Sequence, residues 1–353
     1  MTEVYPKVSV VVINARDKEW LGKCLDSLVE TDYPVFEIVV VDCQTPEIEK
    51  WVAEHYESVR LFPFKEDIGP SASHNVGVAE ADPSSRYLAF VDNDTIVDPC
   101  WLKELISVMR KDETIGIAQA KILKLGREDR LDHTGLAIDT LGTWCTTLNM
   151  KEENFKEVLE VFAASLAGCI VKHEVFNEVG GFDDDYFIYD DDTDFCWRAR
   201  LLGYRVVFIP SAMVIHSGQI AKGVKPRKLF HGVKNRGYTL LKNLELKNLW
   251  WRMCVYYVVM SLCALTFVAL FKPGEAHATL RGLAEMITNF RKIWRKRLKV
   301  QTTRRVKDEA LFERKLLRKD MWATLLYLRN VAPVAVVGKE GSSPTDKQRH
   351  QTG

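Results

Sequence analysis

The sequence predicts an open α/β sheet followed by a helical, membrane-associated region, and three observations indicate this fold class. Short β-branched runs alternate with helix-like segments over roughly the first 220 residues, as in a mostly parallel sheet covered by helices. A run of 23 residues at 249–271 contains a single charged residue. The segment after it is strongly basic, with fifteen Lys and Arg against five Asp and Glu in residues 272–319.

The N-terminal segment predicts a βαβ unit. "KVSVVVIN" (7–14) and "FEIVVVD" (36–42) are short apolar runs, typical of parallel strands buried on both faces. The stretch between them places apolar residues at helical spacing, namely Trp20, Leu21, Cys24, Leu25 and Leu28. A third run, "YLAFVD" (87–92), precedes the predicted helix "PCWLKELISVMRK". The alternation of strands and helices therefore continues beyond the first unit.

Polar residues stand at the ends of these predicted strands. Asn14, Asp42 and Asp92 each close an apolar run. Ligands of open α/β sheets bind outside the carboxyl ends of the strands. Three polar residues at such ends in one half of the chain therefore indicate a binding site.

Asp92 and Asp94 follow the third strand in "FVDNDTIVD", and three interpretations arise: a calcium loop, a metal site for a diphosphate, or an ordinary polar turn. An EF-hand loop that begins at Asp92 needs Gly at its sixth position and Glu at its twelfth. The chain has Val97 and Lys103 there, which excludes the EF-hand. The ordinary turn stays open, because Asp and Asn favour turns.

A second acidic cluster lies in "YFIYDDDTDFCWR", with carboxylates at Asp190, Asp191, Asp192 and Asp194. Carboxylates so close together repel one another, which raises the pKa of some of them. A carboxylate with a raised pKa beside a predicted site is a candidate general base. Acids also favour the first turn of a helix, and both roles can hold at once for different members of the cluster.

The second half of the chain predicts membrane contact. A span needs about 20 apolar residues, so 249–271 is long enough, with a buried core helix as the alternative. Apolar residues then recur at helical spacing between basic ones, at Leu280, Leu283, Ile287, Phe290, Trp294 and Leu298. A basic amphipathic helix at about 279–300 is typical of a helix in the lipid headgroup layer. A solvated bundle helix is the alternative.

Charge and cysteine usage exclude other classes. Residues 1–248 carry a net charge of −11 against the basic C-terminal segment. We expect no nucleic-acid partner, because the basic segment lacks aromatic residues interleaved for base stacking. The eight cysteines contain no CxxC pair, which argues against a zinc site or a secreted disulfide scaffold. The N-terminus shows no pattern of a cleaved signal.

Five motifs occur in one order along residues 7–240: "KVSVVVINARDKEWLGKCLDSL", "FEIVVVDCQT", "DIGPSASHNVGVA", "YLAFVDNDTIVDPCWL" and "VGGFDDDYFIYDDDTDFCWRARLLGYRVVFIPSAMVIH". Together they resemble the family 2 inverting glycosyltransferases of the GT-A fold. The resemblance is closest to members that associate with membranes and extend lipid-linked or cell-surface glycans. It implies a nucleotide-sugar donor and a divalent cation, Mn²⁺ or Mg²⁺.

The resemblance also implies roles for individual residues. The metal ligands would be Asp94, Asp92 and His216, with a structural histidine as the alternative for His216. Asp192 would be the catalytic base, and Asp191 would hold the acceptor. The nucleotide-sugar contacts would be Asn14, Asp42, Gly69, Asn75 and Asp92, although "DCQT" departs from the family's usual sequence after the second strand. Lys234 and Arg236 are possible phosphate contacts.

The expected organisation is a GT-A domain at 1–240, a membrane-associated helical region at 241–338 and a disordered tail at 339–353. We expect GDP-mannose as the donor and a polyprenyl phosphate or lipid-linked glycan as the acceptor. The catalytic domain should face the cytoplasm, where such donors are made. A single crossing by 249–271 would place the basic segment outside, against the usual preference, so the topology stays open. The alternative functions are a non-catalytic glycan-assembly scaffold and a soluble nucleotide-sugar enzyme.

Overall fold

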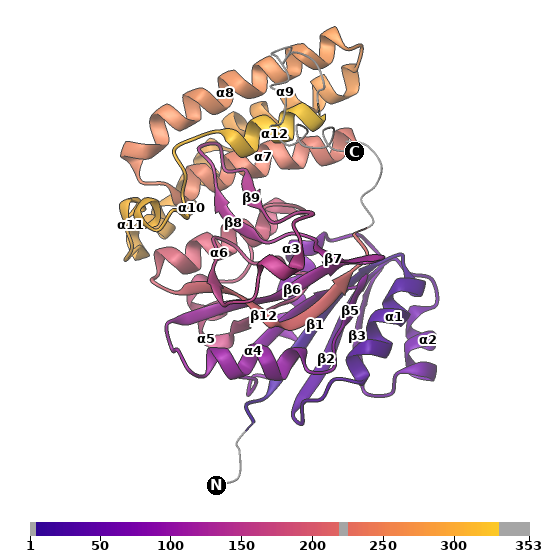
Figure 1. Ribbon diagram of the computed structural model, residues 1–353. Helices are drawn as coiled ribbons and strands as arrows, with labels where there is room; N and C mark the ends of the chain where they lie inside the picture. The colour runs from indigo at the N-terminus through magenta and orange to yellow at the C-terminus, as the bar shows by residue number, and fades with distance from the viewer. Residues whose placement is uncertain (1–4, 219–224, 332–353) are drawn as a thin grey trace, which may run out of the picture.

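A computed structural model describes residues 5–218 and 225–331. It shows a mixed sheet flanked by helices, with a layer of long helices stacked above it (Figure 1). The expected α/β domain followed by a helical region is therefore confirmed. The expected disordered tail at 339–353 lies outside the described residues.

The N-terminal half supplies the parallel part of the sheet. Its strands alternate with helices in the order β1 (Val8–Ala15), α1 (Lys18–Val29), β2 (Phe36–Cys43), α2 (Ile48–His55), β3 (Val59–Phe64), α3 (Pro70–Ala79) and β4 (Tyr87–Asp92). Strand β1 lies between β2 and β4, and Asn14 is in register with Asp42, while Ile13 is in register with Asp92. The parallel register therefore brings the three predicted strand-end residues to one edge.

The second half of the sheet reverses direction twice. It contains β5 (Thr95–Val97), α4 (Trp101–Met109), β6 (Ile115–Lys124), β7 (Arg127–Leu131), β10 (Leu159–Glu160), β11 (Cys169–Lys172), α5 (His173–Val179), α6 (Asp191–Leu201) and β12 (Arg205–His216). Strand β11 is antiparallel to both β4 and β6, and β12 is parallel to β6. Since β12 thus runs in the same sense as β4, His216 ends at the same edge as Asp92.

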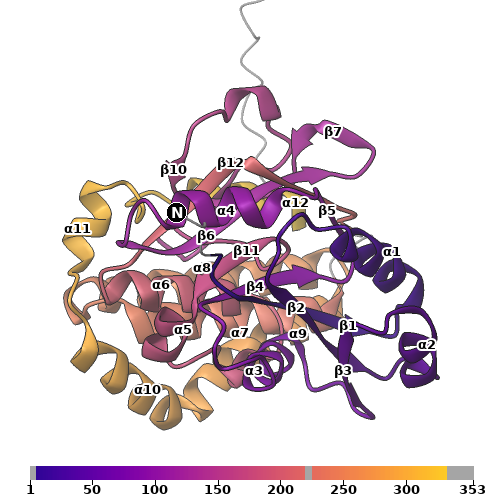
Figure 2. The same ribbon diagram turned by 90° about the horizontal axis from the view of Figure 1, so that it is seen from below.

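Apolar residues fill both faces of the sheet, as alternation along β1 shows. Val10 and Val12 belong to the cluster under α1 and α4, whereas Val11 belongs to the cluster on the opposite face, under α3, α5 and α6. Helix α4 packs across β6 and β12 (Figure 2). A strand buried on both sides needs a continuous β-branched run, which is why "VSVVV" could be recognised from the sequence.

The helical layer comprises α7 (Pro226–Asn243), α8 (Leu246–Ala269), α9 (Pro273–Thr288), α10 (Phe290–Thr303), α11 (Asp308–Glu313) and α12 (Trp322–Val331). Helix α7 packs against α6 of the sheet domain and against α9 and α10 of the layer. The buried Arg252 of α8 donates to the carbonyl of Thr140 at 3.0 Å. The layer is therefore joined to the sheet domain through packing and buried polar contacts.

Two predicted features of this region, the basic helix and the domain boundary, differ from the observed helices. The single basic helix predicted at about 279–300 is two helices, α9 and α10, separated at Asn289. The apolar spacing continues through this junction, so periodicity did not reveal it. The expected domain boundary at residue 240 falls inside α7. Among the described residues, one helix, α8, is long and apolar enough by length and composition to cross a membrane.

Candidate active site

Three predicted metal ligands meet at the carboxyl edge of the sheet. Asp92 ends β4, Asp94 lies in the turn before β5, and His216 ends β12. The pairing of β5 with β12 places Thr95 opposite His216. Ligand atoms of the three side chains all lie within 4.8 Å of one another. His216 Nε2 is 3.1 Å from Asp94 Oδ1 and 3.9 Å from Asp92 Oδ2.

A fourth residue, Asp132, orients the histidine. Its Oδ2 lies 2.6 Å from His216 Nδ1, and the residue is buried. A carboxylate on Nδ1 fixes the imidazole ring and directs Nε2 toward Asp94, as for metal-binding histidines. The sequence reasoning missed Asp132. It follows β7 in the polar stretch "REDRLDH", where no pattern distinguishes it from Glu128 and Asp129, and only the pairing of β7 with β6 brings it to His216.

The charges of the cluster show what it can bind. Burial alone would lower the pKa of His216, but hydrogen bonds to Asp132 and Asp94 outweigh it and raise the pKa to about 10. Burial raises the pKa of Asp92 to about 6. Burial opposes ionisation of Asp94 too, but hydrogen bonds from His216 and Ser217 lower its pKa. The positive charge of protonated His216 thus offsets the negative charge of the neighbouring carboxylates.

A divalent cation fits this set of donors. Two carboxylates and one imidazole suit Mn²⁺ or Mg²⁺, with the imidazole favouring Mn²⁺. The partial burial of Asp92, Asp94 and His216 limits competition from water. A cation would bring its own positive charge to the acids, so His216 could give up its proton and offer Nε2 as a ligand.

The predicted nucleotide contacts form a hydrogen-bonded group at the ends of β1, β2 and β4. Asn14 Nδ2 donates to Asp42 Oδ1 at 2.6 Å, and Asn93 Nδ2 donates to Asn14 Oδ1 at 2.7 Å. Thr45 Oγ1 donates to the same oxygen of Asp42 at 2.7 Å. Asn93 and Thr45 were not predicted. Asn93 stands one residue beyond the end of β4 and Thr45 two residues beyond the end of β2, where the sequence offers no signal other than polarity.

Gly69 and Asn75 lie farther round this edge. Gly69 precedes α3 with φ of 81°, and a Cβ there would come within 2.6 Å of the Phe187 ring. Asn75 Nδ2 donates to the carbonyl of Phe182 at 2.9 Å and to Asp184 Oδ1 at 2.7 Å, while its Oδ1 accepts from Phe182 N. Both residues therefore contact the loop that leads to α6.

The acidic cluster divides between the start of α6 and the protein interior. Asp190 has φ of 60° and precedes the helix, and Asp191 accepts from Ser71 Oγ at 3.1 Å. Asp192 Oδ1 accepts from Thr193 N at 2.6 Å. Asp194 is fully buried in ion pairs, with Arg198 at 2.8 Å and Lys242 at 2.9 Å. Asp194 is therefore structural.

The acids at the start of α6 resist ionisation. Burial raises the pKa of Asp190 and of Asp191 to about 6 each. Burial also raises the pKa of Asp192 well above its ordinary value, and the charges of Asp191 and Asp190 add to the effect. A carboxylate so placed accepts a proton more readily than an exposed one.

Trp144 connects the two acidic clusters. It lies in the hairpin of β8 (Gly135–Ile138) and β9 (Trp144–Thr146), and its Nε1 donates to Thr193 Oγ1 at 2.7 Å. Its ring lies 5.7 Å from that of His133, whose Nδ1 is 3.4 Å from Asp132 Oδ1. This series of contacts joins Thr193, which follows Asp192, to Asp132, which orients His216. No sequence pattern predicts Trp144 at this site, because only the pairing of β8 with β9 brings it here.

The two basic residues predicted as phosphate contacts lie on opposite faces of α7. Lys234 Nζ donates to the carbonyl of Asp185 at 2.6 Å. Arg236 instead lies over the Tyr327 ring at 5.2 Å, and its buried Nε has no hydrogen-bond partner among the described residues. Positions two apart on a helix face different ways, so a single phosphate cannot contact both.

Comparison with known proteins finds a family that matches more than half of the chain. The profile described as "Glycosyltransferase like family 2" matches residues 6–237. O-antigen biosynthesis protein RfbC of Myxococcus xanthus is 29% identical over 224 residues, which are 60% of this chain and 17% of RfbC. An N-acetylglucosaminyl-diphospho-decaprenol L-rhamnosyltransferase of Mycobacterium tuberculosis is 30% identical over 96 residues, 27% of this chain and 31% of that protein. The chain thus spans less than a third of either relative.

Solved structures agree on the fold. The mannosyltransferase PcManGT from Pyrobaculum calidifontis, in complex with GDP-Man and Mn²⁺, superposes with a TM-score of 0.51 at 16% identity. The match covers 80% of this chain and 88% of PcManGT. The predicted family and fold are therefore both confirmed, because the profile covers more than half of the chain. The chain belongs to the glycosyltransferase-like family 2 and has the GT-A fold.

Proposed function

We propose that the protein transfers a sugar from a nucleotide-diphosphate donor to a hydroxyl group of a lipid-linked acceptor, with inversion at the anomeric carbon. The observation that carries the proposal is the meeting of Asp92, Asp94 and His216 at one sheet edge, joined through Trp144 to the start of α6. A cation site and a candidate base on one connected surface are what metal-assisted displacement of a diphosphate needs.

The bound cation would be held by Asp94, Asp92 and His216, and would neutralise the charge that builds on the departing diphosphate. Asp192 accepts the proton of the attacking hydroxyl as the new carbon–oxygen bond forms and the bond to the diphosphate breaks. Its Oδ1 is fixed by Thr193, which leaves Oδ2 for the acceptor. Asp191 holds the acceptor beside it. A single displacement inverts the configuration and forms no covalent enzyme intermediate.

In the proposal, the remaining predicted contacts bind the donor beside the metal site and the base. Asn14 and Asp42 face the base and ribose, supported by Thr45 and Asn93. Gly69 lets the loop at Phe187 approach α3, and Asn75 acts on the donor through that loop. Arg236, whose Nε has no hydrogen-bond partner within residues 5–218 and 225–331, is the better candidate of the two basic residues for a phosphate.

The acceptor proposal draws on the mycobacterial relative, whose name places its sugar on a diphospho-decaprenol lipid. We propose an acceptor of the same chemistry here, a polyprenyl phosphate or a glycan attached to one. GDP-mannose is the proposed donor, followed by UDP-sugars and dTDP-rhamnose. The rhamnosyltransferase name keeps dTDP-rhamnose in the comparison.

A donor panel tests the function. Purified protein in detergent with Mn²⁺ and a polyprenyl phosphate is incubated with GDP-mannose, UDP-sugars and dTDP-rhamnose, and the lipid product is measured. We expect transfer from one nucleotide class, with a product of inverted anomeric configuration. A retained configuration would contradict the mechanism. Donor binding without transfer to any acceptor would favour a non-catalytic scaffold.

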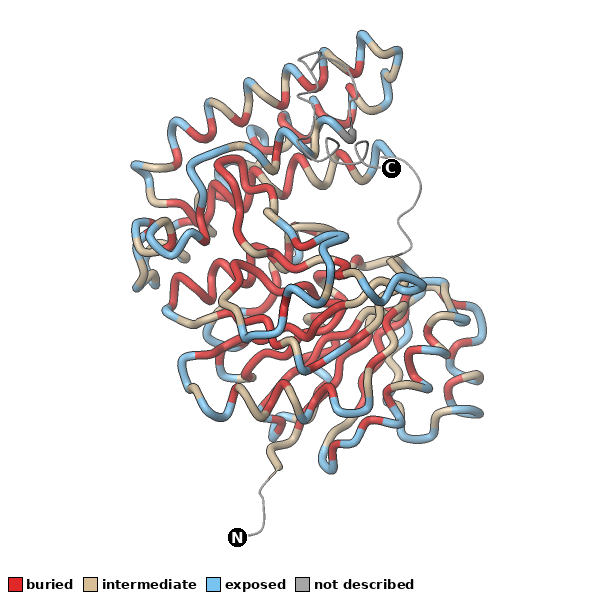
Figure 3. Tube along the Cα trace, in the orientation of Figure 1, coloured by how far each residue is buried: buried red, intermediate tan, exposed pale blue. Residues whose placement is uncertain are grey.

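We also propose that the helical layer rests on the membrane surface. Helix α8 buries one face against the layer, with Tyr256 Oη donating to the carbonyl of Val233 at 2.6 Å. Its other face exposes the apolar residues Val258, Leu262, Leu265 and Val268. Figure 3 shows buried, intermediate and exposed residues alternating along the upper helices. Because the charged helices α7 and α9 pack alongside α8, a crossing would carry their charges into hydrocarbon. Helix α8 is therefore proposed to lie along the bilayer.

Flotation with vesicles that contain anionic lipid tests this orientation. Replacement of two exposed apolar residues, Leu262→Gln with Leu265→Gln, should lower vesicle binding by about tenfold, since each loses apolar burial. The matched control is Val29→Gln with Val35→Gln, which changes two exposed apolar residues of the sheet domain. Alkaline carbonate should release the wild-type protein. Resistance to carbonate would favour a span, and equal binding by all variants would contradict the proposed surface.

A further inference from the structure

The loop that leads to α6 has an unusual backbone. Phe187, Tyr189 and Asp190 have φ of 64°, 70° and 60° respectively. None is glycine, and non-glycine residues enter this left-handed region only when their surroundings impose it. Asp192 lies two residues beyond the last of them. Whatever imposes this backbone therefore also sets the position of Asp192.

The helical layer supplies one of these constraints through Asn235. This residue of α7 is fully buried, and its Nδ2 lies 2.9, 2.7 and 2.8 Å from three loop carbonyls, those of Tyr186, Ile188 and Tyr189, which share its two N–H donors. One amide thus holds both sides of the left-handed turn. A side chain without this donor would remove a hydrogen bond from these carbonyls, of which only that of Tyr186 also accepts from Ile188 N, at 2.8 Å, among the contacts of the described residues. That loss disfavours the observed backbone.

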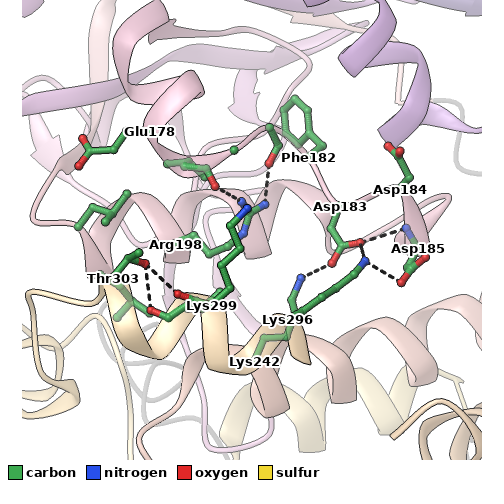
Figure 4. Close-up of a pocket in the computed structure, with 16 residues that line it drawn as sticks. Glu178, Phe182, Asp183, Asp184, Asp185, Arg198, Lys242, Lys296, Lys299 and Thr303 are labelled. Atoms are coloured by element: carbon green, nitrogen blue, oxygen red, sulfur yellow. Dashed lines mark hydrogen bonds and ion pairs between the residues drawn. The ribbon is translucent and has the colours of Figure 1, made fainter. Parts of the chain in front are cut away.

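Lysines from two helices hold the beginning of the same loop, as Figure 4 shows. Lys242 of α7 lies 2.6 Å from Asp183 Oδ2. Lys296 of α10 contacts Asp183 as well and lies 2.6 Å from Asp185 Oδ2. Lys292, one helical turn earlier, lies 2.5 Å from Asp185 Oδ1. The basic face of α10 is thus partly turned toward the catalytic domain.

We propose that Asn235, Lys242, Lys292 and Lys296 form a latch that positions the catalytic base. The latch keeps the loop in its left-handed conformation, so that Asp192, in the first turn of α6, has Oδ2 facing the acceptor. This rests on the proposed function, in which Asp192 is the base. It makes the helical layer part of the catalytic arrangement. The four latch residues are positioning residues, because they act through the loop and not on the substrate.

Kinetics of Lys296→Gln provide the first test. Lys296 is partly exposed, so the change should leave the fold intact, and Lys296→Arg keeps the charge. The matched control is Lys299→Gln, on the same helix, since Lys299 is exposed and has no ion pair among the described residues. A displaced base lowers kcat, and misplacement by about 1 Å costs about a hundredfold. We expect kcat to fall about 10- to 100-fold with the donor KM nearly unchanged, and the Arg variant to recover most of the loss.

Hydrogen exchange of the loop provides a readout that does not need turnover. Amides of residues 186–192 should exchange faster in Lys296→Gln and in Asn235→Asp, which keeps the shape of Asn235 but lacks its donors when ionised. Lys299→Gln should match the wild type. Unchanged loop exchange in both latch variants would overturn the latch, whatever the activity. Faster exchange with no turnover of any donor by the wild type would instead overturn the proposed function and support the loop-holding role.

Discussion

Asp192→Asn is expected to lower kcat for sugar transfer by about 10²- to 10⁴-fold, the usual contribution of a general base. The amide keeps an oxygen for the hydrogen bond from Thr193, so the start of α6 should retain its geometry. Donor affinity should stay within about threefold, because the base acts on the acceptor hydroxyl. Single-turnover transfer and donor binding by calorimetry would measure the two effects separately.

The pH dependence of the same reaction identifies the base more sharply. Burial raises the pKa of Asp191 to about 6 and that of Asp192 well above its ordinary value. A base works only when ionised, so kcat/KM should reach its maximum above the raised pKa and fall as the pH drops through that pKa. We expect the acidic limb of the wild-type profile well above the range of an ordinary aspartate, whose pKa is about 4. A limb near pH 4, or an active Asp192→Asn variant, would contradict the assignment, and the exposed Glu174→Gln serves as control.

Asp94→Asn is expected to remove most metal-stimulated transfer, by about 10²- to 10³-fold, because a cation contributes several kcal/mol to transition-state charge. Asp132→Asn should have a smaller effect, about 10- to 100-fold in Mn²⁺ affinity, as for other residues that orient a metal-binding histidine. It should keep substantial activity when Mn²⁺ is raised to saturation. Titration of transfer with Mn²⁺ after chelation would measure both.

Asp94→Asn and Asp132→Asn should also differ in their rescue by excess Mn²⁺, a difference that a purely structural role would not produce. If Asp94 and Asp132 only maintained the fold, both variants would lose activity in proportion to their loss of melting temperature, and excess Mn²⁺ would rescue neither. Wild-type transfer that survives complete chelation would contradict the metal site. The assignment of His216 as a ligand would then give way to an ion-paired structural histidine.

The strand ends could be predicted because of how parallel strands are built. A strand buried on both faces needs an unbroken β-branched run, so its end is visible where the first polar residue appears, as at Asn14 and Asp92. Parallel pairing then brings such ends to one edge without further information. The role of His216 came from the family resemblance, since a histidine at the end of a run is otherwise as consistent with a structural contact.

Asp132 and Trp144 could not be predicted in this way. Each reaches the site through a hairpin, and hairpin register depends on contacts between residues distant from the site in the sequence. The latch shows a related limit. The apolar spacing of the basic segment indicated an amphipathic helix with its charges free for lipid headgroups. Periodicity shows which residues share a helix face but not what that face contacts. Lys292 and Lys296 contact Asp185 and not lipid headgroups.

The course of α7 has a consequence for how this protein can be divided. The family match ends at residue 237, inside α7, yet Lys296 contacts Asp185, in the loop that leads to α6, from far beyond that point. The C-terminal third is therefore not an interchangeable module. A chimera that borrowed this region from a relative would need lysines matched to Asp183 and Asp185, and the two halves should have changed together during the divergence of the family.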